Sequence, residues 1–180
     1  APGRGSVQAL PGAFVRARAP AARPADVGAR LPAEVARVPE RLSFTEAAAV
    51  PEAFITAFDS IITQAGLAAG ETLLIHAVGS GVGLAALQIA KSSGARVIGT
   101  SRTEGKLAAC REYGLDAGIV TAEPIFAAAV AEASQGRGAD VILDLVGGAY
   151  FPENLRCLAP KGRMMLVGLT AGRKAEADLG

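Results

Sequence analysis

Beyond Gly70, the chain alternates between short, continuously apolar runs and longer amphipathic stretches. The apolar runs predict strands at Thr72–Ala77, Arg96–Thr100, Gly118–Val120, Asp140–Val146 and Arg163–Gly168. The stretches between them predict helices at Gly81–Ser93, Thr103–Tyr113, Pro124–Ser134 and Ala149–Leu158. Strands that are apolar at successive positions are typical of a parallel sheet whose two faces are both covered by helices. We therefore predict an α/β fold with a doubly wound parallel sheet, which is the Rossmann fold.

Two helical segments are predicted before the first strand. Ser43 and Glu46 have the spacing of a capping box, in which each side chain accepts a hydrogen bond from the backbone amide of the other residue. The short helix that begins there is predicted to be interrupted by Pro51. A second helix follows, with apolar residues on one face that packs on a core: Phe54, Ile55, Phe58, Ile61 and Ile62.

The segment 1–41 differs in composition from the rest of the chain. It holds six of the ten prolines, and it contains seven arginines but only three acidic residues. Prolines this frequent prevent a regular helix, and glycine, alanine and arginine leave little to bury. We favour an irregular, disordered or loosely docked arm over a basic anion-binding tail. The expected organisation is this arm followed by a nucleotide-binding domain over residues 42–180.

Composition excludes several classes of protein. The 180 residues are 51% hydrophobic and 19% charged, with a net charge of +1, which argues against a disordered chain and gives no electrostatic reason to expect nucleic acid as a partner. No apolar run reaches the length of a membrane span, and the first residues do not have the pattern of a secretory signal. Two cysteines and one histidine cannot form a metal site unaided or a disulfide framework. We therefore expect a reduced, cytoplasmic protein without a metal.

A glycine-rich turn joins the first predicted strand to its helix. Ser80, Gly81 and Val82 would let the backbone approach a pyrophosphate closely, and the free amides of the helix start would face the anion. Gly83 would let the helix pack tightly on the strand. The spacing departs from the strict G-x-G-x-x-G, because Ser80 and Ala77 stand upstream of Gly83. We favour dinucleotide binding over a tight turn without a ligand.

The end of the second predicted strand indicates which dinucleotide is bound. Sites specific for NAD carry an acidic residue there, whereas this chain has Ser101 and Arg102, with Lys106 one helical turn later. Arginine and lysine suit a phosphate on the ribose, so we expect NADPH. Glu104 weakens the argument because it could pair with Arg102 or Lys106. The alternative to a phosphate site is an ordinary helix start whose charged side chains are solvated.

The sequence resembles the zinc-independent quinone oxidoreductases (zeta-crystallin-like) of the medium-chain dehydrogenase/reductase superfamily. The match runs from about Leu42 to Leu179 and looks closest to the tumour-suppressor-inducible quinone oxidoreductase branch. Five segments carry it: Ala48–Phe58, Gly70–Ala77, Ser80–Gly83, Ile142–Gly148 and Leu158–Arg163. Enzymes of this family transfer a hydride from NADPH to quinones or activated enones, and they commonly dimerise through the edge of the sheet. The resemblance thus implies a quinone or enone substrate and a possible homodimer.

The resemblance also implies roles for individual residues. Thr56 matches the threonine beside the nicotinamide, and Ser80, Gly81 and Val82 match the pyrophosphate turn. Ser101 and Lys106 match residues that face the adenosine 2′-phosphate. The backbone that lines the nicotinamide ribose in this family is matched by Leu145, Val146, Gly168 and Leu169.

Two departures from the family pattern affect the expected function. A tyrosine usual after the third strand is absent, since Val120 is followed by Thr121. The family's amino-terminal catalytic domain has no counterpart before Leu42, and the chain stops near where a last strand is expected. The chain thus looks like the cofactor-binding part of a larger reductase.

Other residues invite a catalytic role, but no catalytic residue can be assigned. A lone histidine in a strand, such as His76, is more often packed with its ring nitrogens satisfied. Cys110 and Cys157 are better explained as inert, buried thiols than as nucleophiles. Asp144 near a strand end more often accepts from nearby amides than acts as a base.

The leading hypothesis is an NADPH-dependent oxidoreductase of the quinone reductase type. Two alternatives stay open. One is a non-catalytic nucleotide-binding or interaction module that retains the fold. The other is an enoyl reductase domain of a larger synthase, because such domains share the same motifs.

Overall fold

The computed structural model describes residues 14–16 and 35–176, which belong to two compact units, Ala1–Ile55 and Thr56–Gly180. In the first unit, β1 (Phe14–Arg16) pairs antiparallel with β2 (Val35–Arg37), a pairing that the sequence did not predict. The rest of the predicted arm up to residue 34 lies outside the described residues. The irregular character of that arm stays a prediction.

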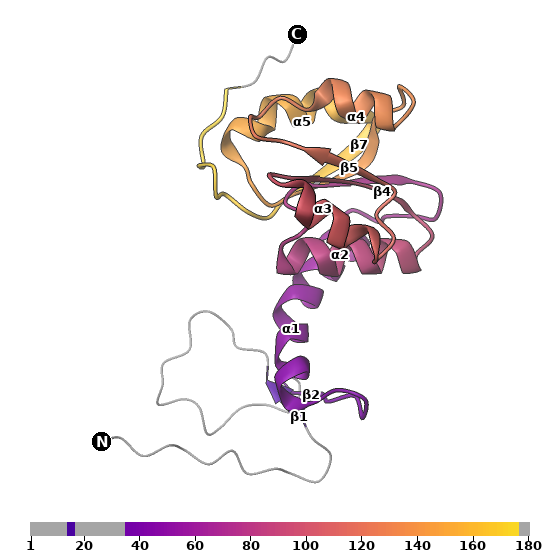
Figure 1. Cartoon of the computed structure of the whole chain (residues 1–180), viewed down its shortest axis with the longest axis vertical. Helices are drawn as coiled ribbons and strands as arrows, with labels where there is room; N and C mark the ends of the chain where they lie inside the picture. The colour runs from indigo at the N-terminus through magenta and orange to yellow at the C-terminus, as the bar shows by residue number, and fades with distance from the viewer. Residues whose placement is uncertain (1–13, 17–34, 177–180) are drawn as a thin grey trace, which may run out of the picture. The chain divides into compact units, whose positions relative to one another are not determined.

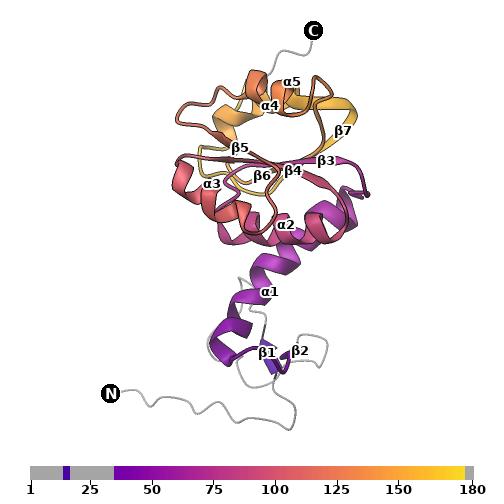
Figure 2. The ribbon, with the colours of Figure 1, turned by 45° about the vertical axis from the view of Figure 1, so that its right-hand side comes forward.

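The second unit is built on a five-stranded sheet in which every neighbouring pair is parallel. In chain order the strands are β3 (Thr72–Ile75), β4 (Arg96–Ser101), β5 (Ala117–Val120), β6 (Ala139–Asp144) and β7 (Leu158–Leu166), and their spatial order is β5-β4-β3-β6-β7. The helices are α2 (Gly81–Ser92), α3 (Glu104–Arg111), α4 (Ala127–Ala133) and α5 (Phe151–Cys157), the last preceded by the 3₁₀ turn η4 (Gly148–Tyr150). Helices α2 and α3 cover one face of the sheet, and α4 and α5 cover the other (Figures 1 and 2). The predicted doubly wound α/β fold is confirmed.

The central strands are buried on both faces, which explains their continuously apolar sequences. Leu74 of β3 and Ile142 of β6 belong to a core cluster with Phe126, Val130 and Cys157, which come from α4, the residue before it, and α5. Successive side chains of a strand point to opposite faces, so the neighbours of Leu74 point toward α2 and α3. These neighbours, Leu73 and Ile75, are also fully buried.

Most predicted element bounds agree with the structure to within a few residues, and two differ for a clear reason. Helix α4 begins at Ala127 instead of Pro124, because the amides of Phe126 and Ala127 donate to Glu153 Oε2 at 2.9 and 2.8 Å. Strand β7 begins at Leu158 instead of Arg163, with an irregularity in its register against β6. An edge strand tolerates proline, since one side of its backbone has no partner strand.

Helix α1 (Phe44–Phe58) corrects the predicted interruption, because it runs through Pro51. The proline removes one backbone hydrogen bond, and the flanking alanines and glutamates favour the helix enough to continue it. The capping box is confirmed: the Ser43 amide donates to Glu46 Oε2 at 2.8 Å, and the Glu46 amide donates to Ser43 Oγ at 3.3 Å. No helix in the described part of the chain, α1 included, is long and apolar enough to cross a membrane.

The predicted apolar face after Pro51 is only partly buried. Ile61 is fully buried, but Ile55 and Phe58 are 59% and 52% exposed. The helix type changes between Phe58 and Ile61, since the α-helix passes into the π-helical segment η3 (Asp59–Gln64). A π-helix has a wider turn, so residues spaced for one α-helical face no longer share a direction.

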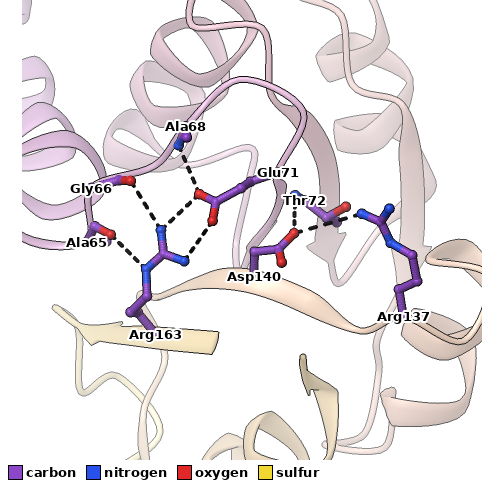
Figure 3. A network of polar contacts seen from close by, with 8 residues as sticks. All are labelled: Ala65, Gly66, Ala68, Glu71, Thr72, Arg137, Asp140 and Arg163. Carbon is purple, nitrogen blue, oxygen red and sulfur yellow. Dashed lines mark hydrogen bonds and ion pairs between the residues drawn. The ribbon is translucent and has the colours of Figure 1, made fainter. Parts of the chain in front are cut away.

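A polar clamp fixes the amino ends of the strands, as Figure 3 shows. The guanidinium of Arg163 in β7 forms two parallel 2.8 Å hydrogen bonds with the Glu71 carboxylate, just before β3. Arg163 Nε also donates to the Ala65 carbonyl at 2.8 Å, at the end of η3. Alongside, the Thr72 amide donates to the Asp140 carboxylate of β6 at 2.7 Å. The clamp thus ties together η3, β3, β6 and β7.

Candidate functional site: a cleft at the carboxyl ends of the strands

The second unit contains a cleft of about 760 Å³ at the carboxyl ends of its strands. The chain builds β3, β4 and β5 in one direction and then places β6 and β7 on the other side of β3. The crevice at such a reversal is where open α/β sheets bind ligands. The lining residues lie at or beyond the carboxyl ends of all five strands: Ala77, Gly79, Ser80, Thr100, Ser101, Arg102, Thr103, Lys106, Thr121, Ala122, Leu145, Val146, Tyr150, Thr170 and Ala171.

The turn after β3 lies against the start of α2 with almost no space between them. A Cβ atom on Gly83 would lie 2.5 Å from the Ala77 carbonyl oxygen and 2.8 Å from Val78 Cα. The predicted role of Gly83 in close packing therefore agrees with the geometry. Ser80 is the N-cap of α2, and its hydroxyl accepts from the Gly83 amide at 3.1 Å. The Val78 amide donates to the Thr100 carbonyl at 3.0 Å, which ties the turn to the end of β4.

Two cations line the cleft where β4 ends, and the lining contains no carboxylate. These cations are Arg102 and Lys106, both exposed. Glu104, which could have neutralised them, instead pairs with Arg111 at 2.6 Å. In the described part of the chain, neither Arg102 nor Lys106 forms an ion pair. The cleft therefore presents net positive charge to a ligand, together with the hydroxyl groups of several serines, threonines and Tyr150.

The opposite wall is formed where the loop after β7 lies on the turn after β6. The Ala171 amide donates to the Val146 carbonyl at 2.8 Å. A Cβ on Gly148 would lie 2.2 Å from the Ala171 carbonyl oxygen, and one on Gly168 would lie 2.2 Å from the Leu145 carbonyl oxygen. These glycines let the two backbones touch. The loop and the turn thus form one continuous wall.

A chain of buried polar side chains connects the three central strands beneath the cleft. Asp144 Oδ1 accepts from the Val146 and Gly147 amides at 2.8 and 2.9 Å, and Asp144 Oδ2 accepts from Asn154 Nδ2 at 2.9 Å. Asn154 Oδ1 lies 2.6 Å from His76 Nε2, and His76 Nδ1 lies 2.9 Å from Thr100 Oγ1. The predicted structural roles of His76 and Asp144 agree with these contacts.

The polar chain has a single consistent arrangement of protons while the histidine is neutral. A carboxylate only accepts, so Asn154 donates through Nδ2 and its Oδ1 must accept from His76 Nε2–H. His76 Nδ1 is then the acceptor, and the Thr100 hydroxyl donates to it. Burial lowers the pKa of His76, although Asn154 and Asp144 act in the opposite direction. The imidazole is thus held neutral in the fold.

The lowered pKa of His76 predicts that the protein loses stability as the pH falls from 7 to 5. In this range the unfolded histidine takes up a proton, at an ordinary pKa of about 6.5, and the folded one takes up less because its pKa is lower. The free energy of unfolding therefore falls as the pH drops below about 6.5 and is restored when the pH rises again. His76 is the single histidine of the chain, so no other side chain with an ordinary pKa near 6.5 contributes to the effect.

Urea unfolding at pH 7 and pH 5 measures this difference. The variant His76→Gln keeps a donor and an acceptor and should show little change in the free energy of unfolding between the two pH values. A slope as steep in the variant as in the wild type would rule out His76 as its cause.

Neither cysteine is suited to nucleophilic chemistry. Burial raises the pKa of Cys157 to about 12, and the charge of Glu153 adds to the shift. Burial also raises the pKa of Cys110. At neutral pH both thiols keep their protons, and a thiol without its thiolate form is a weak nucleophile.

The structure brings six of the eleven predicted cofactor-binding residues into the cleft lining. These are Ser80, Ser101, Arg102, Lys106, Leu145 and Val146. Gly81 and Val82 follow Ser80 in the first turn of α2, and Gly168 and Leu169 directly precede the lining residues Thr170 and Ala171. Thr56 is half-buried on α1 and does not line the cleft. The binding role of all eleven stays a prediction.

Sequence reasoning missed several lining residues, among them Tyr150, Thr121 and Thr170. Tyr150 donates to Thr121 Oγ1 at 3.2 Å, and its ring packs against Phe126 and His76 with centroids 5.0 and 4.9 Å apart. The pair Gly147–Gly148 was the available signal, because adjacent glycines after a strand mark a close backbone approach. Thr121 directly follows the third predicted strand, where the family usually has a tyrosine, and this position was the available signal. Nothing local in the sequence marks Thr170.

Comparison with known proteins identifies relatives of this unit. The sequence model of the zinc-binding dehydrogenase family matches residues 81–179. A highly-reducing polyketide synthase of Aureobasidium melanogenum is 36% identical over 141 residues, which is 77% of this chain and 6% of that protein. The chain therefore spans a small fraction of that relative's length.

Two solved structures resemble the same part of the chain. The CurK enoyl reductase has a TM-score of 0.71 and 36% identity, over 75% of this chain and 40% of that one. A quinone oxidoreductase of Pseudomonas syringae pv. Tomato DC3000 has a TM-score of 0.71 and 30% identity, over 80% of this chain and 44% of that one.

Proposed function

The chain belongs to the zinc-binding dehydrogenase family, within the medium-chain dehydrogenase/reductase superfamily, and from this premise we propose that it binds NADPH for an oxidoreductase. Residues 42–180 would be the cofactor-binding domain of that enzyme. One observation carries the proposal: the cleft at the sheet reversal is lined by two cations and many hydroxyls but no carboxylate. A nucleotide that carries an additional ribose phosphate fits this charge better than one with a free ribose hydroxyl.

The residues present suit a nicotinamide nucleotide in the following way. The amides and hydroxyl of Ser80, Gly81 and Val82 would hold the pyrophosphate at the start of α2. Ser101, Arg102 and Lys106 would hold the ribose phosphate. Leu145 and Val146, with the loop that includes Gly168 and Leu169, would exclude water on the nicotinamide side. When bound, the reduced nicotinamide supplies a hydride. The protein's part is to orient the donor and its acceptor.

Two acceptors are compatible with this domain, and each is favoured by similarity to known proteins. The polyketide synthase relative and the enoyl reductase structure favour an enoyl group carried by a larger synthase. The quinone oxidoreductase structure favours a quinone. We propose an activated carbon–carbon double bond or quinone as the substrate class, with the enoyl group as the better supported of the two. The narrower branch named from the sequence stays a prediction, as does a homodimer along the sheet edge.

The family name raises the question of zinc, and the side chains described here do not suit it. Within residues 38–176, no three histidine, cysteine or acidic side chains are grouped to hold a metal. Both ring nitrogens of His76 are already hydrogen-bonded, and burial keeps both cysteines protonated. We assign no step through zinc to these residues.

The proposal predicts that the chain binds NADPH more tightly than NADH and that Arg102→Gln removes most of this preference. Loss of a charged hydrogen-bonding partner of a phosphate costs about 2 kcal/mol, or roughly 30-fold in affinity. Titration of nicotinamide fluorescence measures both dissociation constants. Arg137→Gln is the matched control, because Arg137 precedes β6 at the far end of the sheet. Tighter binding of NADH than of NADPH by the wild type would contradict the proposal.

A further inference from the structure

The side chain of Lys106 lies across Gly79 in the turn after β3. A Cβ atom on Gly79 would lie 3.1 Å from Lys106 Cβ, 3.5 Å from its Cγ and 3.3 Å from its Cδ. A side chain at position 79 would thus contact three successive carbons of the lysine, and it would be crowded by two of them, Cβ and Cδ. Both residues line the cleft.

This contact restricts where the lysine's charge can lie. Lys106 Cβ is fixed by the backbone of α3, and only Cε separates the carbons that contact Gly79 from the ammonium nitrogen. An exposed lysine otherwise samples many rotamers, and this freedom is lost when it binds a ligand. A lysine side chain that already lies against the turn loses less conformational entropy on binding, because it is partly ordered beforehand. Among residues 38–176, no carboxylate forms an ion pair with this ammonium.

We propose that Gly79 is a specificity-determining position, which seats Lys106 so that its ammonium meets the ribose phosphate of the bound nucleotide. The inference rests on the proposed function and goes beyond it. It adds a second determinant of the preference for NADPH, in the turn after β3, to Arg102 at the end of β4. Gly79 acts through Lys106 and is therefore a positioning residue.

Alanine at position 79 tests the proposal without straining the backbone. The φ angle of Gly79 is outside the left-handed region, so alanine can adopt the same conformation. Its methyl group would lie 3.1 Å from Lys106 Cβ and 3.3 Å from its Cδ, so the lysine side chain would have to shift by a few tenths of an ångström. The pyrophosphate turn would keep its backbone path. The affinity of the protein for NADPH should then fall, while its affinity for NADH stays the same.

The experiment compares the dissociation constants of NADPH and NADH for the 180-residue chain and four variants. We expect Gly79→Ala to weaken NADPH about threefold and to leave NADH unchanged, and Lys106→Met to weaken NADPH roughly tenfold. In the double variant, Gly79→Ala should add nothing to the effect of Lys106→Met, because the two changes act on one interaction. Gly105→Ala is the control. It lies beside Lys106 in α3, and its added Cβ would meet no atom within 4 Å.

The outcomes separate this inference from the proposed function. Equal losses for NADPH and NADH in Gly79→Ala would mean that the methyl group disturbs the turn itself, which overturns the inference. Unchanged NADPH binding in that variant, or the same threefold loss in the Lys106→Met background, also overturns it. A wild-type chain that binds neither nucleotide overturns the proposed function, and the inference with it.

Discussion

Replacing Gly83 with alanine is expected to lower the free energy of unfolding by about 3 kcal/mol and to abolish nucleotide binding in the cleft. The added methyl carbon would lie 2.5 Å from the Ala77 carbonyl oxygen and 2.8 Å from both Cα and the carbonyl oxygen of Val78. All three are backbone atoms that join β3 to α2, so no side-chain rotation can relieve the overlap. The helix would have to move away from the strand, and Ser80 and the amides beside it would move as well.

Urea unfolding and nucleotide titration measure the two effects of Gly83→Ala separately. Gly105→Ala is again the control, because it adds the same methyl group to a helix where nothing lies within 4 Å. It should leave stability unchanged or raise it by up to about 1 kcal/mol, since alanine favours a helix over glycine. An unfolding midpoint of Gly83→Ala equal to that of the wild type would show that α2 can move without cost.

The second large effect is expected for Asn154→Leu, which should lower the free energy of unfolding by about 3 kcal/mol. Leucine has a branched side chain like asparagine, but it is larger and cannot hydrogen-bond. His76 Nε2 and Asp144 Oδ2 would each lose a buried partner, at 2.6 and 2.9 Å respectively. An unpaired polar group costs more in the interior than at the surface, above all when it is charged, because it is cut off from water.

A matched exchange of an amide for leucine is available on α2. Gln88 is half-buried and donates to the Leu84 carbonyl of its own helix, at 3.2 Å. Gln88→Leu should change the free energy of unfolding by less than about 0.5 kcal/mol. If Asn154→Leu were equally mild, the buried polar chain would have no part in joining the central strands. Both variants are measured by urea unfolding at pH 7, where the neutral form of His76 predominates in the folded and unfolded states.

The sequence could predict those features that depend on neighbouring residues in the chain. Strands β3 and β6 were found because their burial on both faces requires continuous apolar runs. The turn at Ser80 and Gly83 was found because a strand, small residues and a helix follow one another directly. Arg102 and Lys106 were found because the residues after a second strand face the nucleotide in this fold.

Features that depend on distant contacts were beyond the sequence. Asn154 belongs to a short helix with no motif, and its importance comes from His76, which lies 78 residues earlier. The course of the chain through Pro51 was wrongly predicted, because one missing hydrogen bond was outweighed by helix-favouring neighbours. The exposure of Ile55 and Phe58 could not be foreseen either, since a change from α- to π-helix leaves no simple pattern in the residues.

The clamp between Glu71 and Arg163 has a consequence for the order in which the protein assembles. The two residues are 92 apart in sequence, and β6 lies between their strands. Closing so long a segment of chain costs entropy that is recovered only when the intervening strand–helix units are already in register. The ion pair should therefore form among the last contacts of the folding reaction. Interactions that form after the transition state slow unfolding more than they speed folding, so this pair should prolong the lifetime of the native state.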